Sequence, residues 1–193
     1  MARFNYTMTS EKIERYVQDG RGQGHGPNYK PWLTVFDFSS HGQVTREVGI
    51  KTSRIHHTFS KNETCCLSIF QMSPAISDIR EQFPLLPLRE TELIADGLGI
   101  RHPADPKSKC NIVLTTDLLL DVARNNSTIE VARTVKPSGD LGNSRVIEKL
   151  EIERRYWATR GIDWGIIIAE DIPRELAHNC QFLAGYYSLA QLQ

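Results

Sequence analysis

The stretches Asn111-Ile-Val-Leu-Thr-Thr-Asp117-Leu-Leu-Leu120 and Ile129-Glu-Val-Ala-Arg-Thr-Val-Lys136-Pro137 decide the fold of this chain. Both are rich in β-branched and apolar residues, and the segment Arg124-Asn-Asn-Ser127 between them is typical of a turn. They therefore predict a hairpin at the centre of a sheet. The first run contains one ionisable residue, Asp117, and the second ends on Lys136, so we expect a carboxylate and an ammonium side by side.

This pairing of Asp117 with Lys136 has two interpretations. The commoner one is a surface salt pair between neighbouring strands. The other is the active site of a PD-(D/E)xK nuclease, in which the acid binds a divalent metal ion and the lysine approaches the attacked phosphate. Hard oxygen ligands suit Mg²⁺, and a metal ion beside a cation stabilises charge on phosphoryl oxygens. The spacing alone leaves both interpretations open.

Length and composition set the class of protein. The 193 residues fit one α/β domain of ordinary size. Because 23 Lys and Arg balance 23 Asp and Glu, nucleic-acid binding would have to come from local patches or from partners. The four cysteines lack metal-site spacing and predict free thiols. No apolar run has the length of a membrane-spanning helix and no signal peptide is recognisable, so we expect a soluble, cytoplasmic protein without a membrane partner.

Periodicity and capping residues predict the other elements. Helices are expected at residues 9–18, 61–72, 88–98 and 143–160 and from residue 173 onward, and strands at residues 32–38, 43–49, 54–59, 75–83 and 163–169. The strand at 163–169 follows a helix, which predicts parallel pairing. The strands between 32 and 59 predict an antiparallel meander.

The glycine-rich segment Gly20–Pro27 has no strand before it and no Gly-Lys-Ser/Thr, which argues against a nucleotide-binding loop. A flexible connector is the favoured interpretation. The alternative is a contact with backbone phosphates that uses Arg21 and His25.

Two glutamates are further candidates. Glu63 lies in the first turn of the helix 61–72, where a glutamate most often interacts with the helix dipole. Glu153 falls in the middle of the apolar stripe of the helix 143–160, so it needs a partner in the protein interior. One interpretation is a salt bridge with an arginine at the edge of the core. The other is a carboxylate that is turned toward the same metal site or that orients Lys136.

Several strings spread in order from about residue 10 to residue 175 carry a family resemblance. They are Gly20-Arg-Gly-Gln-Gly-His-Gly26, Pro31-Trp-Leu-Thr-Val35, Asp78-Ile-Arg-Glu-Gln-Phe-Pro-Leu-Leu-Pro87, Thr116-Asp117, Val135-Lys136-Pro137 and Glu148-Lys-Leu-Glu-Ile-Glu-Arg-Arg-Tyr-Trp157. The chain resembles the TnsA family, the endonuclease subunit of heteromeric DNA transposases. The resemblance implies a restriction-endonuclease-like α/β fold, with a mixed central sheet flanked by helices.

The resemblance also implies a site and a reaction. The family's catalytic residues fall on Glu63, Asp117 and Lys136, and a further functional glutamate falls on Glu153. Glu63, Asp117 and the main-chain carbonyl of Val135 would hold Mg²⁺, or Mn²⁺ in its place. The implied reaction is hydrolysis of phosphodiester bonds at the 5′ ends of a transposon, together with a TnsB-like transposase subunit and a TnsC-like ATPase. The implied location is the bacterial cytoplasm, at the nucleoid during the reaction.

Two features depart from the family pattern. Thr134 stands where the family has Gln or Glu, and this shorter side chain has a weaker claim to a metal ion. The chain also stops near the point where longer members begin a C-terminal domain. Two alternatives stand beside the transposase nuclease. One is a stand-alone restriction or repair nuclease of the same fold, and the other is a catalytically silent assembly subunit in which Thr134 marks decay of the site.

The expected organisation has three parts. Residues 1–60 hold an N-terminal helix, the glycine-rich loop and antiparallel strands, residues 61–170 form the nuclease core, and residues 171–193 form a C-terminal helix and tail.

Overall fold

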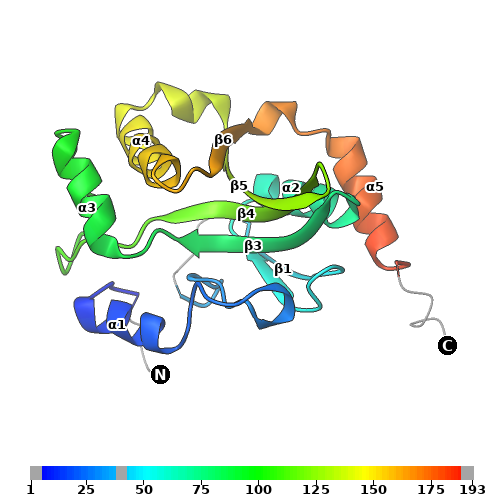
Figure 1. Cartoon of the computed structure of the whole chain (residues 1–193), viewed down its shortest axis with the longest axis horizontal. Helices are drawn as coiled ribbons and strands as arrows, with labels where there is room; N and C mark the ends of the chain where they lie inside the picture. The colour runs from blue at the N-terminus through cyan, green and yellow to red at the C-terminus, as the bar shows by residue number, and fades with distance from the viewer. Residues whose placement is uncertain (1–5, 38–42, 188–193) are drawn as a thin grey trace.

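A four-stranded mixed sheet lies at the centre of the computed structural model, which describes residues 6–37 and 43–187 (Figure 1). The strands lie in the order β3-β4-β5-β6; β4 is antiparallel to β3 and to β5, and β6 is parallel to β5. Their bounds are β3 (Ile76–Pro84), β4 (Thr115–Arg124), β5 (Ser127–Lys136) and β6 (Asp163–Ile168). The predicted mixed sheet and the predicted parallel strand are confirmed.

The β4–β5 hairpin turns at Asn125 and Asn126. Both residues have positive φ, 49° and 60°, and Arg124 pairs with Ser127 across the turn. Two successive left-handed residues match the twist of the strands on either side, and asparagine adopts this conformation more readily than most residues. The hairpin expected from the sequence is therefore formed by a two-residue turn, and it sets Asp117 and Lys136 at the same end of the sheet.

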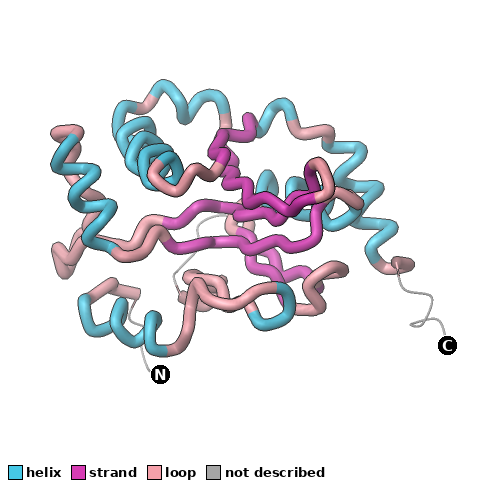
Figure 2. Tube along the Cα trace, in the orientation of Figure 1, coloured by secondary structure: helices cyan, strands magenta, loops and turns pink. Residues whose placement is uncertain are grey.

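Helices cover both faces of this sheet (Figure 2). On one face, α2 (Lys61–Met72) and α5 (Arg174–Ala184) share a core cluster with Leu118 and Leu120 of β4. On the other, α4 (Ser144–Ala158) and α3 (Leu88–Gly97) share a cluster with Leu119. Alternate residues of β4 thus enter different cores, as the period of a strand requires.

The N-terminal part lies beside the main sheet and holds a separate two-stranded sheet. Its elements are α1 (Ser10–Gln18), β1 (Thr45–Val48) and β2 (Ile55–Thr58). The predicted strand at residues 32–38 is wrong for its described part. Trp32 is fully buried against Tyr16, and Thr34 donates two hydrogen bonds to the carboxylate of Asp37. These local bonds form a turn and replace strand pairing; Phe38 lies outside the described residues.

The glycine-rich loop is held in place by hydrogen bonds. Gly22 N–H donates to the carbonyl of Lys30 at 2.6 Å, and Gly26 N–H donates to Asp78 at 3.1 Å. Gly24 has φ of +89°, and a Cβ there would lie 2.5 Å from the carbonyl oxygen of Asn28, so only glycine fits. The loop is therefore a fixed connection, and the prediction of a flexible connector is wrong. Arg21 pairs with Asp37 at 2.7 Å, whereas the side chain of His25 is 68% exposed, so a phosphate contact at this loop stays a prediction.

The described residues also form three short 3₁₀ segments: η1 (Gly26–Asn28), η2 (Ser138–Gly142) and η3 (Ala169–Asp171). All four cysteines are free, as predicted. Within the described ranges, no helix has the length and apolar character needed to cross a membrane.

Candidate active site

Asp117 and Lys136 lie together where β4 and β5 meet. The ammonium of Lys136 donates to Asp117 Oδ2 at 3.2 Å and to its neighbour's carbonyl, Val135 O, at 3.1 Å. The N–H of Val135 also donates to Asp117 Oδ2, at 2.8 Å. The hairpin therefore sets a carboxylate, an ammonium and a main-chain carbonyl side by side. In the described ranges no donor binds Asp117 Oδ1, which leaves that oxygen for another ligand.

Glu63 approaches this group from the first turn of α2. Ser60 accepts a hydrogen bond from Glu63 N–H at 3.2 Å, and its hydroxyl donates to Glu63 Oε1 at 2.8 Å. Phe59 N–H donates to Oε2 at 3.0 Å. The glutamate lies at the third helical position, as in a capping box, but the backbone N–H that it accepts from is that of Phe59, one residue before the cap. The helix-terminal role expected for Glu63 is thus present, and the same bonds hold its carboxylate at the edge of the pocket that contains Asp117.

Glu153 enters from α4 on the side opposite Glu63. The hydroxyls of Thr134 and Thr116 donate to Glu153 Oε1 at 2.5 and 2.7 Å. Trp157, one helical turn further on, donates to the Thr116 hydroxyl at 2.7 Å. Among the described residues no arginine forms a salt bridge with Glu153, so the predicted arginine partner is contradicted. Its partners are two neutral hydroxyl groups from β4 and β5.

These side chains line one pocket of about 550 Å³. The ionisable residues in its wall are Glu63, Asp117, Lys136, Asp140, Lys149 and Glu153. Four carboxylates and two ammonium groups therefore share one hollow. Such an excess of negative charge favours the binding of a cation.

Burial and mutual repulsion perturb the protonation of the site. Burial, and then the charge of Asp117, raise the pKa of Glu63 well above its ordinary value. Burial raises the pKa of Glu153 to about 7, against the hydrogen bond from Thr134. For Lys136, burial would lower the pKa, but the charges of Asp117 and Glu153 outweigh it and the pKa is raised. Carboxylates that resist ionisation beside a lysine that stays charged are typical of functional sites.

The donor set fits a hard divalent cation. Asp117 Oδ1, a Glu63 oxygen and the Val135 carbonyl are oxygen ligands of the kind that Mg²⁺ prefers, and Mg²⁺ sites often use only one or two carboxylates. A cation between Glu63 and Asp117 would also offset the repulsion that raises the pKa of Glu63. The residues present are therefore suited to hold Mg²⁺ or Mn²⁺.

Thr134, the residue that departs from the family pattern, lies against Glu153. The residue is 2% exposed and its hydroxyl donates to Glu153 Oε1, so the side chain supports the glutamate. Sequence reasoning missed Thr116 as its counterpart. The only signal was position, since Thr116 precedes Asp117 and Thr134 lies two residues before Lys136. It also missed Lys149, which lies four residues before Glu153 on α4.

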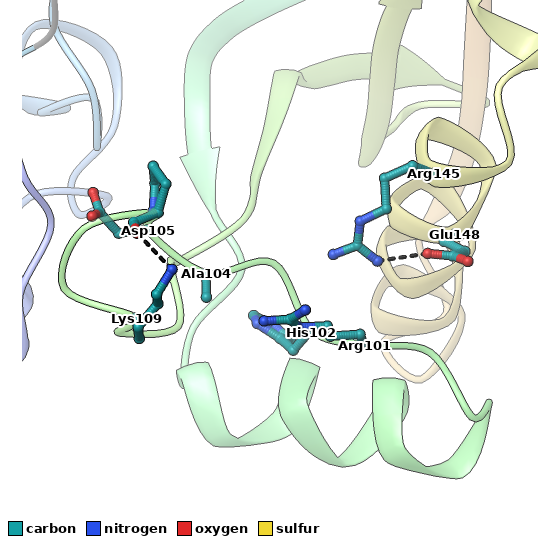
Figure 3. A pocket seen from close by; sticks show the side chains of 8 residues that line it. Arg101, His102, Ala104, Asp105, Lys109, Arg145 and Glu148 are labelled. Atoms are coloured by element: carbon teal, nitrogen blue, oxygen red, sulfur yellow. Dashed lines mark hydrogen bonds and ion pairs between the residues drawn. The ribbon is translucent and has the colours of Figure 1, made fainter.

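A second hollow of about 410 Å³ lies between the segment after α3 and the start of α4 (Figure 3). Arg101 and Lys109 line it from the segment, and Arg145 and Glu148 from α4. Arg145 donates to Glu148 at 2.6 Å, and Lys109 donates to a backbone carbonyl, Pro106 O. We call this hollow the basic groove.

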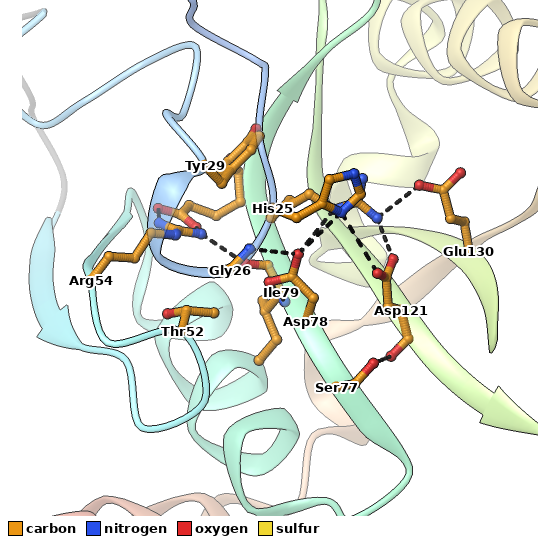
Figure 4. A network of polar contacts seen from close by, with 12 residues as sticks. His25, Gly26, Tyr29, Thr52, Arg54, Ser77, Asp78, Ile79, Asp121 and Glu130 are labelled. Carbon is orange, nitrogen blue, oxygen red and sulfur yellow. Dashed lines mark hydrogen bonds and ion pairs between the residues drawn. The ribbon is translucent and has the colours of Figure 1, made fainter.

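His25 of the glycine-rich loop, Asp78 of β3 and Asp121 of β4 form a separate polar cluster (Figure 4). Their potential ligand atoms lie within 4.8 Å of one another. A guanidinium already occupies this cluster: Arg80 pairs with Asp121, and its Nε lies 3.6 Å from Asp78. Because the arginine supplies the positive charge, we interpret the cluster as the link between the glycine-rich loop and the sheet.

Comparison with known proteins gives the family. Residues 73–169 match the model of the family described as TnsA-like endonuclease N terminal. The chain is also similar to the transposon Tn7 transposition protein TnsA of Escherichia coli, with 39% identity over 183 residues. That alignment covers 95% of this chain and 66% of the relative, so the chain spans just under two thirds of the relative's length. The chain belongs to the TnsA-like endonuclease family.

Proposed function

We propose that this chain is the divalent-metal-dependent DNA endonuclease subunit of a heteromeric transposase, which hydrolyses phosphodiester bonds at the 5′ ends of a transposon. The observation that carries the proposal is the convergence of Glu63, Asp117, Glu153 and Lys136 in one pocket. Membership of the TnsA-like endonuclease family supports the nuclease activity. Similarity to a transposition protein supports the biological setting, and the partners would be a TnsB-like transposase subunit and a TnsC-like ATPase.

In this proposal, Asp117, Glu63 and the Val135 carbonyl hold Mg²⁺, or Mn²⁺ in its place. When bound, the ion would activate a water molecule and stabilise the leaving 3′ oxygen. Lys136 keeps its charge in the pocket and stabilises negative charge on the phosphoryl oxygens. Glu153 is held by Thr116 and Thr134 and sets the electrostatic environment of this lysine.

A nicking assay tests the proposal and its two alternatives. Supercoiled DNA that carries the transposon ends is incubated with the chain, with or without the two partner subunits, in Mg²⁺, Mn²⁺ or EDTA. We expect metal-dependent cuts at the 5′ ends only with the partners present. Cutting by the chain alone would favour a stand-alone nuclease. If the complex with the partners forms but cuts no DNA in either Mg²⁺ or Mn²⁺, a silent assembly subunit is favoured.

A further inference from the structure

The basic groove and the catalytic pocket share a wall, because α4 contributes to both. Arg145 and Glu148 line the groove, and Lys149 and Glu153 line the pocket. The segment that contributes Arg101 to the groove continues into the strand that carries Asp117. The two hollows are therefore neighbours along one helix and one connecting segment.

Arg145, Lys149 and Glu153 follow one another at four-residue intervals, so they form one stripe along α4. Eight helical residues advance by about 12 Å. Along the axis of a duplex, where each nucleotide of a strand rises by about 3.4 Å, that length covers roughly three to four nucleotides. The stripe therefore leads from the catalytic pocket into the basic groove over a distance of a few phosphates.

Of the three positive groups along this path, one is paired and partly exposed, and two have no partner among the described residues. Within the described ranges, the side chains of Lys149 and Arg101 make no hydrogen bond or ion pair. Arg145 uses one guanidinium nitrogen for Glu148 and has 40% of its side chain exposed. Of the two carboxylates in the groove, Glu148 pairs with Arg145, and Asp105 accepts hydrogen bonds from backbone N–H groups, including that of Met8 at 2.9 Å.

We propose that the basic groove binds the sugar–phosphate backbone of the DNA strand that is cut. Lys149 contacts the phosphate beside the scissile one, and Arg145 and Arg101 contact the phosphates that follow. Guanidinium groups are suited to this task because they bind phosphate oxygens through paired hydrogen bonds. The inference rests on the proposed nuclease function and specifies which surface holds its substrate. It also shows how a chain of zero net charge can bind DNA through a local patch.

The test measures DNA binding in EDTA, so that no metal and no cleavage contribute. Anisotropy of a fluorescent DNA duplex is followed against salt for the wild type and for Lys149→Ala, Arg145→Ala and Lys149→Arg. Arg124→Ala is the matched control, because Arg124 is an exposed cation in the hairpin, at the far end of β4 from Asp117. Melting temperatures verify that each variant is folded.

We expect the slope of log affinity against log salt to fall by about 0.9 for each lost phosphate contact. Lys149→Ala and Arg145→Ala should each show this loss with several-fold weaker binding, Lys149→Arg should retain the slope, and Arg124→Ala should behave as wild type. Unchanged slopes in Lys149→Ala and Arg145→Ala would overturn the inference. So would an equal loss in Arg124→Ala, or a wild type that does not bind at low salt.

The nicking assay on the same preparations separates this inference from the proposed function. If the wild type cuts in Mg²⁺ while Lys149→Ala and Arg145→Ala bind DNA normally, the groove is not the DNA-binding surface and the nuclease function still holds. If the wild type binds DNA through the groove but never cuts it, the nuclease function is rejected and the DNA-binding role of the groove still holds.

Discussion

The hydroxyl of Thr134 donates to Glu153 Oε1 at 2.5 Å, and this bond ties β5 to α4 at the floor of the catalytic pocket. Thr116 donates to the same oxygen from β4. A glutamate that is 5% exposed is thus held by two neutral groups and not by a cation. The orientation of the Glu153 carboxylate depends on the packing of α4 against the hairpin. The increase that its charge causes in the pKa of Lys136 depends on the same packing.

Replacing Thr134 by valine should lower the rate of DNA cleavage by roughly 10- to 100-fold, the usual cost of losing a group that orients a metal site. Valine keeps the shape of threonine and removes the donor to Glu153. Thr134→Ser keeps that donor and should retain most of the activity. Thr128→Val is the matched control, because Thr128 is exposed on the same strand. If Thr134→Val cuts DNA as fast as Thr128→Val, the support of Glu153 by Thr134 has no part in catalysis.

Glu153→Gln should separate activity from stability. We expect activity to fall by roughly 10- to 100-fold, with no loss of melting temperature, since glutamine still accepts bonds from Thr116 and Thr134. A structural ion pair would give the opposite result, because the same change would strand a buried cation and lower the melting temperature. Unchanged activity of the folded variant would remove Glu153 from the site.

The stability difference between wild type and Glu153→Gln should depend on pH. The pKa of Glu153 is about 7 in the folded state and 4.5 ordinarily, because burial disfavours the charge. The folded state therefore binds this proton more tightly than the unfolded state does. The contribution of Glu153 to the free energy of unfolding of the wild type falls as pH rises from 4.5 through about 7. Glu153→Gln has no group that titrates at this position. In EDTA, its free energy of unfolding should therefore rise relative to that of the wild type across this pH window, by at most about 3 kcal/mol. Thermal unfolding across this pH range measures it, and parallel curves would contradict the buried charge.

Asp117→Asn should abolish cleavage and leave the fold intact. The amide oxygen can still accept from Val135 N–H and Lys136, so no buried donor is left unpaired, while the charge that favours a metal ion is removed. Circular dichroism and melting temperature check the fold, and Asp96→Asn on α3 serves as the surface control. Cleavage at the normal rate by Asp117→Asn would exclude this carboxylate from the reaction.

Lys136→Met should lose cleavage without losing metal affinity, because an ammonium is not a metal ligand. Removal of the cation also leaves Asp117 Oδ2 without its charged partner, so binding of Mn²⁺ should stay equal or become tighter. Calorimetric titration with Mn²⁺ compares the variant with the wild type. A loss of metal binding as large as the loss of activity would assign Lys136 a structural role.

Local sequence determined the elements that carry the site. The Asn125-Asn126 turn and the apolar runs around it specify the hairpin, and Ser60 with Glu63 specifies the start of α2. These signals depend on neighbours along the chain, so they can be interpreted without a structure. The same kind of local periodicity placed Glu153 within the apolar face of α4.

Only the tertiary structure decided what these elements bring together. The partners of Glu153 come from residues 19 and 37 positions away, and sequence periodicity shows that such a residue is buried but not what it meets. The failed strand before Phe38 has the same cause, because Trp32 is buried against Tyr16 and Asp37 engages Arg21. The alignment of the basic groove with the catalytic pocket likewise depends on where α4 crosses the sheet, because packing between distant segments sets the position of the helix.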